Sequence, residues 1–154
     1  MIIPFETDTT MQQKYPRSPK ALLGGIAHLC RFIDKVRLRH AGKIQDYNYI
    51  TVGFDKHLVE FLQIDAKTFE QRALAGGTDK DLLVWVVANG KKVTAAEIRL
   101  FTRNLLGAKP EDDGARQRLQ GRLQAIATKR GVSVSALPPA HAWADVIEID
   151  EERL

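Results

Sequence analysis

The sequence lacks the features that would place it in an oxidising compartment or in a membrane. Its 154 residues include one cysteine, Cys30, so no disulfide can form within the chain. The longest apolar run, residues 82–88, is far shorter than the roughly 18 residues that a membrane span requires. The first residues lack the basic region and apolar run of a signal peptide. We therefore expect a soluble, cytoplasmic protein.

Motifs that would identify a reaction are also missing. The pair Gly24 and Gly25 is not followed by the lysine of a phosphate-binding loop. His28, Asp55 and His57 lack the spacing of a helical zinc site, and no zinc finger, helix-turn-helix or aromatic nucleic-acid motif is recognisable. We expect neither a metal nor a cofactor, and the sequence leaves open whether the protein is an enzyme.

The charge is distributed unevenly along the chain. The net charge is +4, but residues 1–110 carry +6 and residues 111–154 carry −2. Five basic residues and one acid lie between positions 21 and 44. Such a basic stretch attracts phosphate, carboxylate or nucleic acid, although a solvated helix face has the same composition.

Helical signals recur through the sequence and predict an all-α protein, an irregular array of short helices. Thr78 with Asp81, and Thr94 with Glu97, resemble capping boxes, and Pro110 precedes acids that favour a helix start. An extended segment is expected at most near residues 47–52 or 143–149, where a last helix is the alternative. Further helix starts are predicted at Asp55 and Asp65.

The first long helix is predicted over residues 19–41, with Ser18 as its cap. Apolar residues recur at steps of three and four, which indicates one buried stripe. Gly24 and Gly25 would then lie inside this helix, where each costs about 1 kcal/mol relative to alanine, so we expect a close contact that requires them. The apolar stripe comprises Leu22, Ile26, Leu29, Ile33 and Val36.

The polar face of this helix is the candidate site. Arg31 and Lys35 are suited to hold an anionic small molecule, and Asp34, three residues from both Arg31 and Arg37, is suited to orient a basic side chain. His28 falls on the same stripe and can exchange a proton near neutral pH. The ligand-binding residues we predict are His28, Arg31, Asp34, Lys35, Tyr49 and Asp55, with Tyr49 closing the pocket.

Simpler interpretations remain open for each of these residues. Asp34 can form an ordinary surface ion pair, and His28 can be a hydrogen-bonded structural residue. Tyr49 can clamp a loop on the core, and Cys30, beside Leu29, is expected to be a buried structural thiol. At the level of function, a protein-interaction or structural module, including a homo-oligomer, is the alternative to a small-molecule site. Nucleic-acid binding through the basic residues 116–130 is less favoured.

The domain organisation is predicted to be simple. We expect an N-terminal arm over residues 1–15 and a helical core over residues 16–107. Residues 108–154 are expected to form a C-terminal helix and tail packed on the same domain.

One combination of short motifs resembles a known family. The chain has PRSP at 16–19, LGG at 23–25, Leu29, Arg31, DKVR at 34–37, Tyr49, FD at 54–55, FL at 61–62 and ID at 64–65. This combination is similar to a small bacterial family catalogued as a numbered domain of unknown function, and the likeness covers residues 15–90. The resemblance implies a compact, mainly helical cytoplasmic domain and implies no activity.

Overall fold

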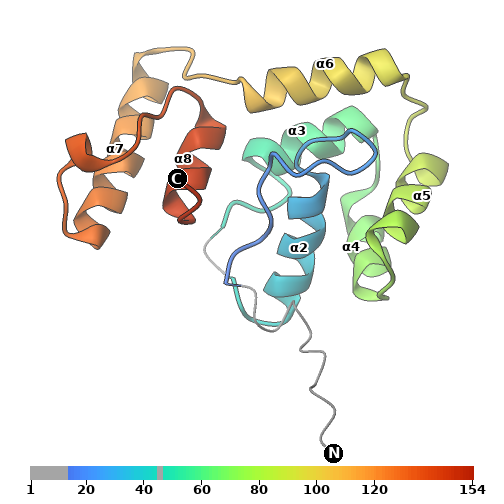
Figure 1. Cartoon of the computed structure of the whole chain (residues 1–154). Coiled ribbons are helices and arrows are strands. Elements are labelled where there is room, and N and C mark those ends of the chain that lie inside the picture. Colours follow the sequence, from blue (N-terminus) through green and yellow to red (C-terminus); the bar gives the residue numbers. More distant parts are fainter. Residues whose placement is uncertain (1–13, 45–46) are drawn as a thin grey trace, which may run out of the picture. The chain divides into compact units, whose positions relative to one another are not determined.

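The computed structural model describes residues 14–44 and 47–154, and its regular elements are helices (Figure 1). No strand occurs among the described residues, so the predicted all-α class is confirmed. Residues 143–149 are helical, and residues 47–52 form a loop. The predicted arm falls almost entirely outside the described residues. The elements are α2 (Leu29–His40), α3 (Gly53–Leu62), α4 (Ala66–Leu74), α5 (Asp79–Asn89), α6 (Ala95–Leu106), α7 (Asp113–Arg130), a 3-10 turn (Val134–Ala136) and α8 (Trp143–Asp150).

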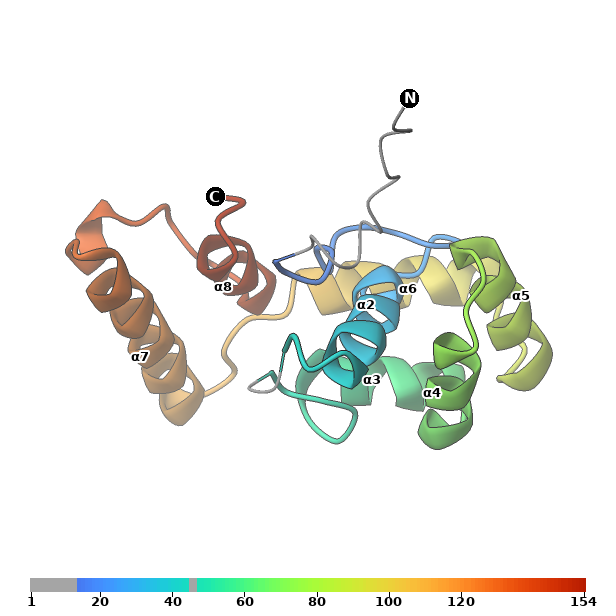
Figure 2. The same cartoon turned by 90° about the horizontal axis from the view of Figure 1, so that it is seen from below.

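The chain forms two compact units, Met1–Phe101 and Thr102–Leu154. In the first unit α2 lies beside α3 and α4, and α5 packs on α4 (Figure 2). The stacked rings of Phe32 and Phe69, with centroids 4.9 Å apart, join α2 to α4. Full burial of such side chains contributes about 1.5–3 kcal/mol each. The buried core contains Ile26, Leu29, Phe32, Ile33, Val36, Leu58, Leu62, Ile64, Phe69, Ala73, Leu82 and Val86.

The second unit has its own smaller core, between α7 and α8. Leu119, Leu123 and Ile126 recur at helical spacing on α7 and pack against Val146 and Ile149 of α8. The packing of residues 108–154 on the core domain stays a prediction. No described helix is long and apolar enough to cross a membrane.

Several helix starts follow the local sequence. The side chains of Asp65 and Asp112 accept from the backbone N–H of Thr68 and Ala115, at 2.9 and 2.7 Å. Thr78 and Asp81 form a reciprocal capping box at the start of α5. These bonds satisfy backbone donors that a helix leaves without intrahelical partners.

The predicted start of the first helix is wrong. Residues 19–28 form turns, with an isolated bridge between Leu23 and Ile26, and α2 begins only at Leu29. Gly24 and Gly25 have φ of 58° and 79°, a left-handed conformation that cannot continue a right-handed helix. The expected close contact is present, because a Cβ on Gly24 would lie 2.8 Å from the Cδ1 atom of Leu83.

Asp55 does not cap α3 as the sequence predicts. The cap position is Val52, and Asp55 lies within the first turn, where the residue is 1% exposed. This carboxylate points into the first unit, where it meets Lys35 of α2 and His28, the residue that precedes α2.

Candidate functional site

Three titratable side chains form a buried cluster in the first unit. Asp55 accepts from the Nε2 atom of His28 at 2.6 Å and from the Nζ atom of Lys35 at 2.8 Å. All three residues are at most 4% exposed. A buried carboxylate is tolerated when it is paired and hydrogen-bonded, as it is here.

The backbone brings these residues together from three places. Lys35 lies on the α2 face that meets the 48–55 segment, and Asp55 comes from the first turn of α3. His28 immediately precedes α2 with φ 69°, a left-handed conformation that is uncommon for a residue with a side chain. This conformation ends the turn that contains Gly24 and Gly25, the glycine turn, and lets α2 begin at the next residue.

The electrostatics define the protonation states of the cluster. Burial lowers the pKa of His28, and this effect outweighs the opposing attraction of Asp55. Burial alone would raise the pKa of Asp55, but its hydrogen bond to His28 and the charge of Lys35 bring it below its usual value. The cluster therefore holds an anionic Asp55, a cationic Lys35 and a neutral His28 at neutral pH.

The tautomer of His28 follows from its partner. An ionised carboxylate only accepts hydrogen bonds, so the Nε2 atom of His28 carries the proton and donates a hydrogen bond to Asp55. Nδ1 is then the unprotonated nitrogen, and it is buried with no hydrogen-bond partner among the described residues. The ring meets Phe54 edge-on, with centroids 5.6 Å apart.

The buried cluster also fixes the loop that precedes α3. Lys35 donates to the backbone carbonyl of Asn48, and the backbone N–H of Ile50 donates to Asp55 at 2.9 Å. Ile50 has φ 60°, which is strained for a β-branched residue and persists only where other contacts enforce it. The two bonds hold the backbone on either side of Tyr49.

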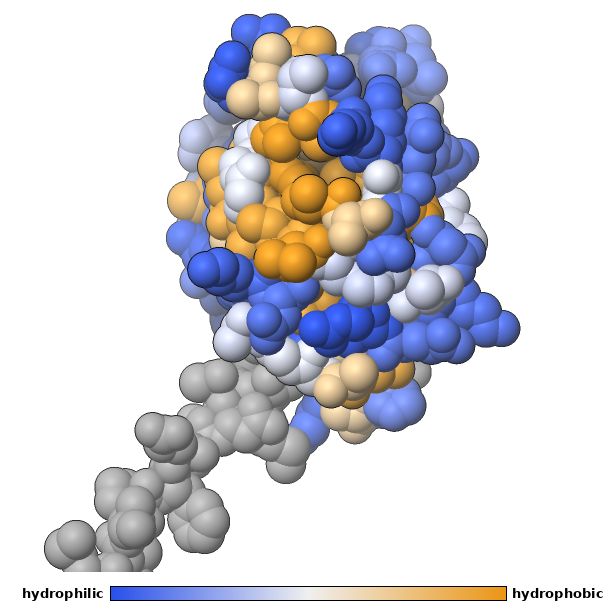
Figure 3. All heavy atoms as spheres, turned by 90° about the vertical axis from the view of Figure 1, so that its right-hand side faces the viewer, coloured by the Kyte–Doolittle hydropathy of each residue, from blue (hydrophilic) through white to orange (hydrophobic). Residues whose placement is uncertain are grey.

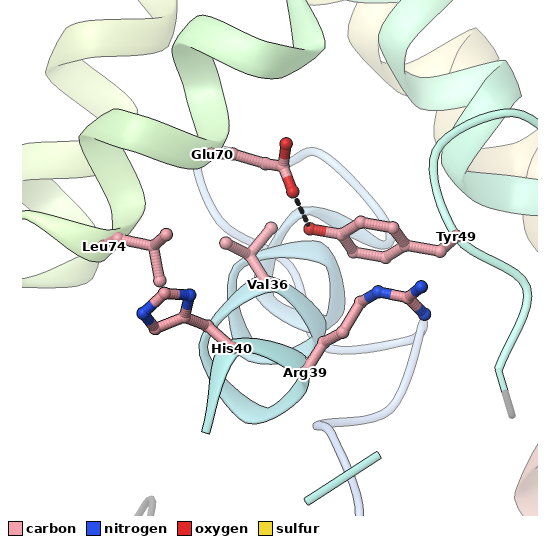
Figure 4. Close-up of a pocket in the computed structure, with 6 residues that line it drawn as sticks. All are labelled: Val36, Arg39, His40, Tyr49, Glu70 and Leu74. Atoms are coloured by element: carbon pink, nitrogen blue, oxygen red, sulfur yellow. Dashed lines mark hydrogen bonds between the residues drawn. The ribbon is translucent and has the colours of Figure 1, made fainter. Parts of the chain in front are cut away.

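Tyr49 borders a hollow in the first unit with a cavity volume of about 290 Å³ (Figure 4). Its hydroxyl donates to Glu70 at 2.5 Å, and the Arg39 guanidinium lies 4.5 Å from its ring centroid. Burial and the neighbouring Glu70 carboxylate raise the pKa of Tyr49, so the hydroxyl stays protonated at neutral pH. The lining residues are Val36, Arg39, His40, Tyr49, Glu70 and Leu74.

Arg31 and Asp34 belong to a different set of contacts. Asp34 accepts from the Arg17 guanidinium at 2.9 and 3.0 Å, and from the Arg17 backbone N–H at 2.9 Å. Arg17 also pairs with Asp79 at the start of α5 at 2.6 Å, so it bridges two helices. Arg31 donates to the Arg17 carbonyl at 3.3 Å and lies 5.5 Å from the Tyr47 ring centroid.

The six predicted site residues thus divide into three groups. His28, Lys35 and Asp55 share the buried cluster, Arg31 and Asp34 both contact Arg17, and Tyr49 borders the hollow. Whether any of them binds a ligand stays a prediction.

Sequence reasoning missed Arg17, Arg39 and Glu70. Arg17 stood within the PRSP motif, but its partners lie 17 and 62 positions away. Arg39 was visible as a basic residue one turn beyond Lys35. Glu70 carried no signal in the sequence.

Arg37 does not fill the role considered for it beside Asp34. Its guanidinium donates to the carbonyls of Ala73 and Gly77, at 3.0 and 3.2 Å. These bonds satisfy carbonyls at and beyond the end of α4, where a helix lacks intrahelical donors.

Two further observations limit the chemistry of the described residues. Cys30 is a buried free thiol, as expected, and burial raises its pKa, which disfavours the nucleophilic thiolate. Within residues 14–44 and 47–154, no group of three or more histidine, cysteine, aspartate or glutamate side chains is arranged to hold a metal ion.

Comparison with known proteins identifies the family. The model of the family described as "Domain of unknown function (DUF5069)" matches residues 13–153, so the chain belongs to this family. A comparison with curated proteins gives no match. The resemblance to a domain of unknown function is therefore confirmed at the level of the family. That the family is bacterial, and that the short motifs are characteristic of it, stay predictions.

Proposed function

We propose that this DUF5069 protein binds a small anionic molecule in the hollow beside Tyr49. The observation that carries the proposal is the lining of the hollow: Arg39 and His40 from the end of α2 border it together with the Tyr49 ring. An arginine fork matches carboxylate and phosphate oxygens, and an imidazole adds a second donor.

The buried cluster supports this proposal through its effect on the loop. A buried ion pair is weak evidence for stability, since desolvation opposes the attraction between the charges. Here Lys35 and Asp55 bind the backbone on either side of Tyr49. Fixing a side chain before a ligand arrives reduces the ordering cost of binding. We infer that His28, Lys35 and Asp55 act as positioning residues and do not touch the ligand.

The lining also defines the ligand class. Glu70 lies across the hollow from Arg39 and His40 and accepts from Tyr49 (Figure 4). A ligand with an anionic group at one end and a hydrogen-bond donor at the other fits this arrangement of charges. The volume of about 290 Å³ is at the lower end for small-molecule sites, which favours a ligand of few atoms. The proposal includes no chemical transformation.

The test is a thermal-shift titration of the full chain with two probes, inorganic phosphate and glycolate, each of which is an anion that also carries a hydroxyl donor. We expect one or both to raise the melting temperature of the wild type by stabilising the folded state. Arg39→Gln should abolish the increase, because it removes the cationic fork. Arg99→Gln, which removes one charge from an exposed position on α6, should keep it.

Two results would overturn the proposal. One is the absence of any anion-dependent stabilisation of the wild type. The other is an equal loss in both arginine variants, which would indicate nonspecific screening of the net positive charge.

The alternative function, a protein-interaction module, is favoured by a separate observation. The outward side of α5 exposes large apolar side chains, which is where such modules bind partners.

A further inference from the structure

Helix α5 is apolar on the side that faces away from the core. Leu82 and Val86 are buried, yet Val84 and Val87 on the other side are 60% and 67% exposed. Leu83 is half-buried between the two sides. A helix that is apolar all round is normally covered on all sides. In the space-filling view of this side, an apolar area is surrounded by polar residues (Figure 3).

The glycine turn extends this apolar surface. The absence of a Cβ on Gly24 lets the Leu83 side chain pack against the turn, since a Cβ would lie 2.8 Å from Leu83 Cδ1. Leu22, in the same turn, is 51% exposed. We name Leu83, Val84 and Val87 the α5 face.

Lysines border the α5 face at both ends of the helix. Lys80 lies one turn before Val84 on the same side of α5, and Lys91 and Lys92 follow the Gly90 that ends the helix. Lys91 pairs with Glu97 at 3.7 Å. All three lysines are exposed.

The acids at the start of α5 are held by local partners. Asp79 pairs with Arg17 at 2.6 Å, and Asp81 forms the capping box with Thr78. Asp81 keeps its negative charge in these bonds and Lys91 is paired with Glu97, so the positive charge at the edge of the α5 face comes from Lys80 and Lys92.

We propose that the α5 face is the docking surface for an amphipathic helix of another protein, with acidic residues flanking its apolar stripe. A single exposed helix face with apolar residues at i, i+3 and i+4 spacing is matched by a partner helix with the same spacing. Acidic flanks on the partner meet the lysines, which favours encounter and fixes orientation. A second copy of this chain fits less well, because it would bring another lysine-bordered face against the first. The proposal is independent of the hollow beside Tyr49, which involves other residues.

The experiment selects peptides from a phage-displayed library of random 16-residue sequences against the full chain. Enriched peptides are synthesised, and their Kd values are measured by fluorescence anisotropy. We expect apolar residues at helical spacing with flanking Asp or Glu. The double variant Val84→Asp, Val87→Asp should raise the Kd at least tenfold. Val52→Asp, at an exposed valine that precedes α3, is the matched control and should leave it unchanged.

The lysines are tested with the same peptides. Lys80→Glu and Lys92→Glu should each weaken binding severalfold at low salt, whereas Lys56→Glu, on an exposed part of α3, should not. Circular dichroism of each variant checks that the fold is kept, as expected for exposed positions.

Several outcomes would overturn the proposal. One is a selection in which no enriched peptide binds the wild type more tightly than the double variant. Another is a selection that enriches peptides with basic flanks. Light scattering that shows a dimer lost in the double variant would assign the α5 face to a second copy. Binding to phosphatidylserine vesicles that is lost in the double variant would assign it to a lipid surface.

Discussion

Lys35 connects the buried cluster of His28, Lys35 and Asp55 to the loop that precedes α3. It neutralises Asp55 at 2.8 Å and also binds the carbonyl of Asn48, so it couples a charge pair to a loop. Removing one partner of a buried pair leaves the other charge uncompensated in a medium of low dielectric constant. The effect of losing Lys35 is therefore expected to exceed the effect of losing an ordinary surface lysine.

We predict that Lys35→Met reduces the free energy of unfolding by about 3 kcal/mol or more, measured by urea denaturation. Lys43→Met, at an exposed position, should change it by less than about 0.5 kcal/mol. Adding Asp55→Asn to Lys35→Met should cost less than the sum of the two single changes, because no buried charge is then left alone. Strict additivity, or a loss below about 1 kcal/mol, would contradict a coupled buried pair.

At the residue scale the sequence indicated which side chains matter but not their partners. His28, Lys35 and Asp55 were all named as site residues, and the structure joins them. The pairing of Asp34 with Arg17 could not be predicted, because residues 17 positions apart meet only through the fold of the intervening turn. Local spacing instead pointed to Arg31 and Arg37, which are helical neighbours of Asp34.

At the scale of elements, helix ends were predictable where their signals are local. Asp65, Thr78 and Asp112 cap helices with bonds to residues three positions ahead. Both partners of each bond therefore lie within one short stretch of sequence, where the pattern can be recognised. The start of α2 was not predictable in this way, because the apolar spacing of Leu22 and Ile26 continues through a segment that is not helical. The backbone conformation at Gly24 and Gly25 interrupts the helix without interrupting the apolar pattern.

Alanine substitutions at two glycines, Gly24 in the glycine turn and Gly121 in α7, are predicted to change the free energy of unfolding in opposite directions. Gly24→Ala should reduce the free energy of unfolding by more than 1 kcal/mol, through the left-handed φ of 58° and a Cβ only 2.8 Å from Leu83. Gly121→Ala should raise it by up to about 1 kcal/mol, because Gly121 lies inside α7 and a Cβ there meets nothing within 4 Å. Denaturant midpoints of the two variants decide the matter, and a stabilising Gly24→Ala would contradict the strained turn.

At the scale of the whole molecule, the buried titratable cluster lies in the first of two compact units. The second unit is held by the apolar contacts of α7 with α8, together with a bond from the Trp143 N–H to the Ala108 carbonyl at 3.0 Å. Large pH effects on stability near neutrality are therefore expected to originate in the first unit, where His28 is kept neutral by burial.

The pH dependence of global stability has a definite sign. Unfolded His28 takes up a proton near pH 6.5, whereas burial lowers its pKa in the folded state. Below pH 6.5 the unfolded state therefore binds more protons than the folded state. The free energy of unfolding accordingly decreases as the pH is lowered, by at most about 1.4 kcal/mol per pH unit. The lowered pKa of Asp55 adds a further loss only as the pH approaches its unfolded value of 3.8.

Urea denaturation at pH 7.5, 6.0 and 5.0 isolates the contribution of His28. We predict that the wild type loses stability across this range, and that His28→Gln, which keeps an N–H donor but does not titrate, loses much less. His57→Gln, at an exposed position on α3, should retain the wild-type decrease. The same decrease in His28→Gln as in the wild type would show that the fold does not lower the pKa of His28. A steeper decrease in His28→Gln than in the wild type would show that His28 carries its proton in the fold, so that the cluster holds two cations around Asp55 instead of one.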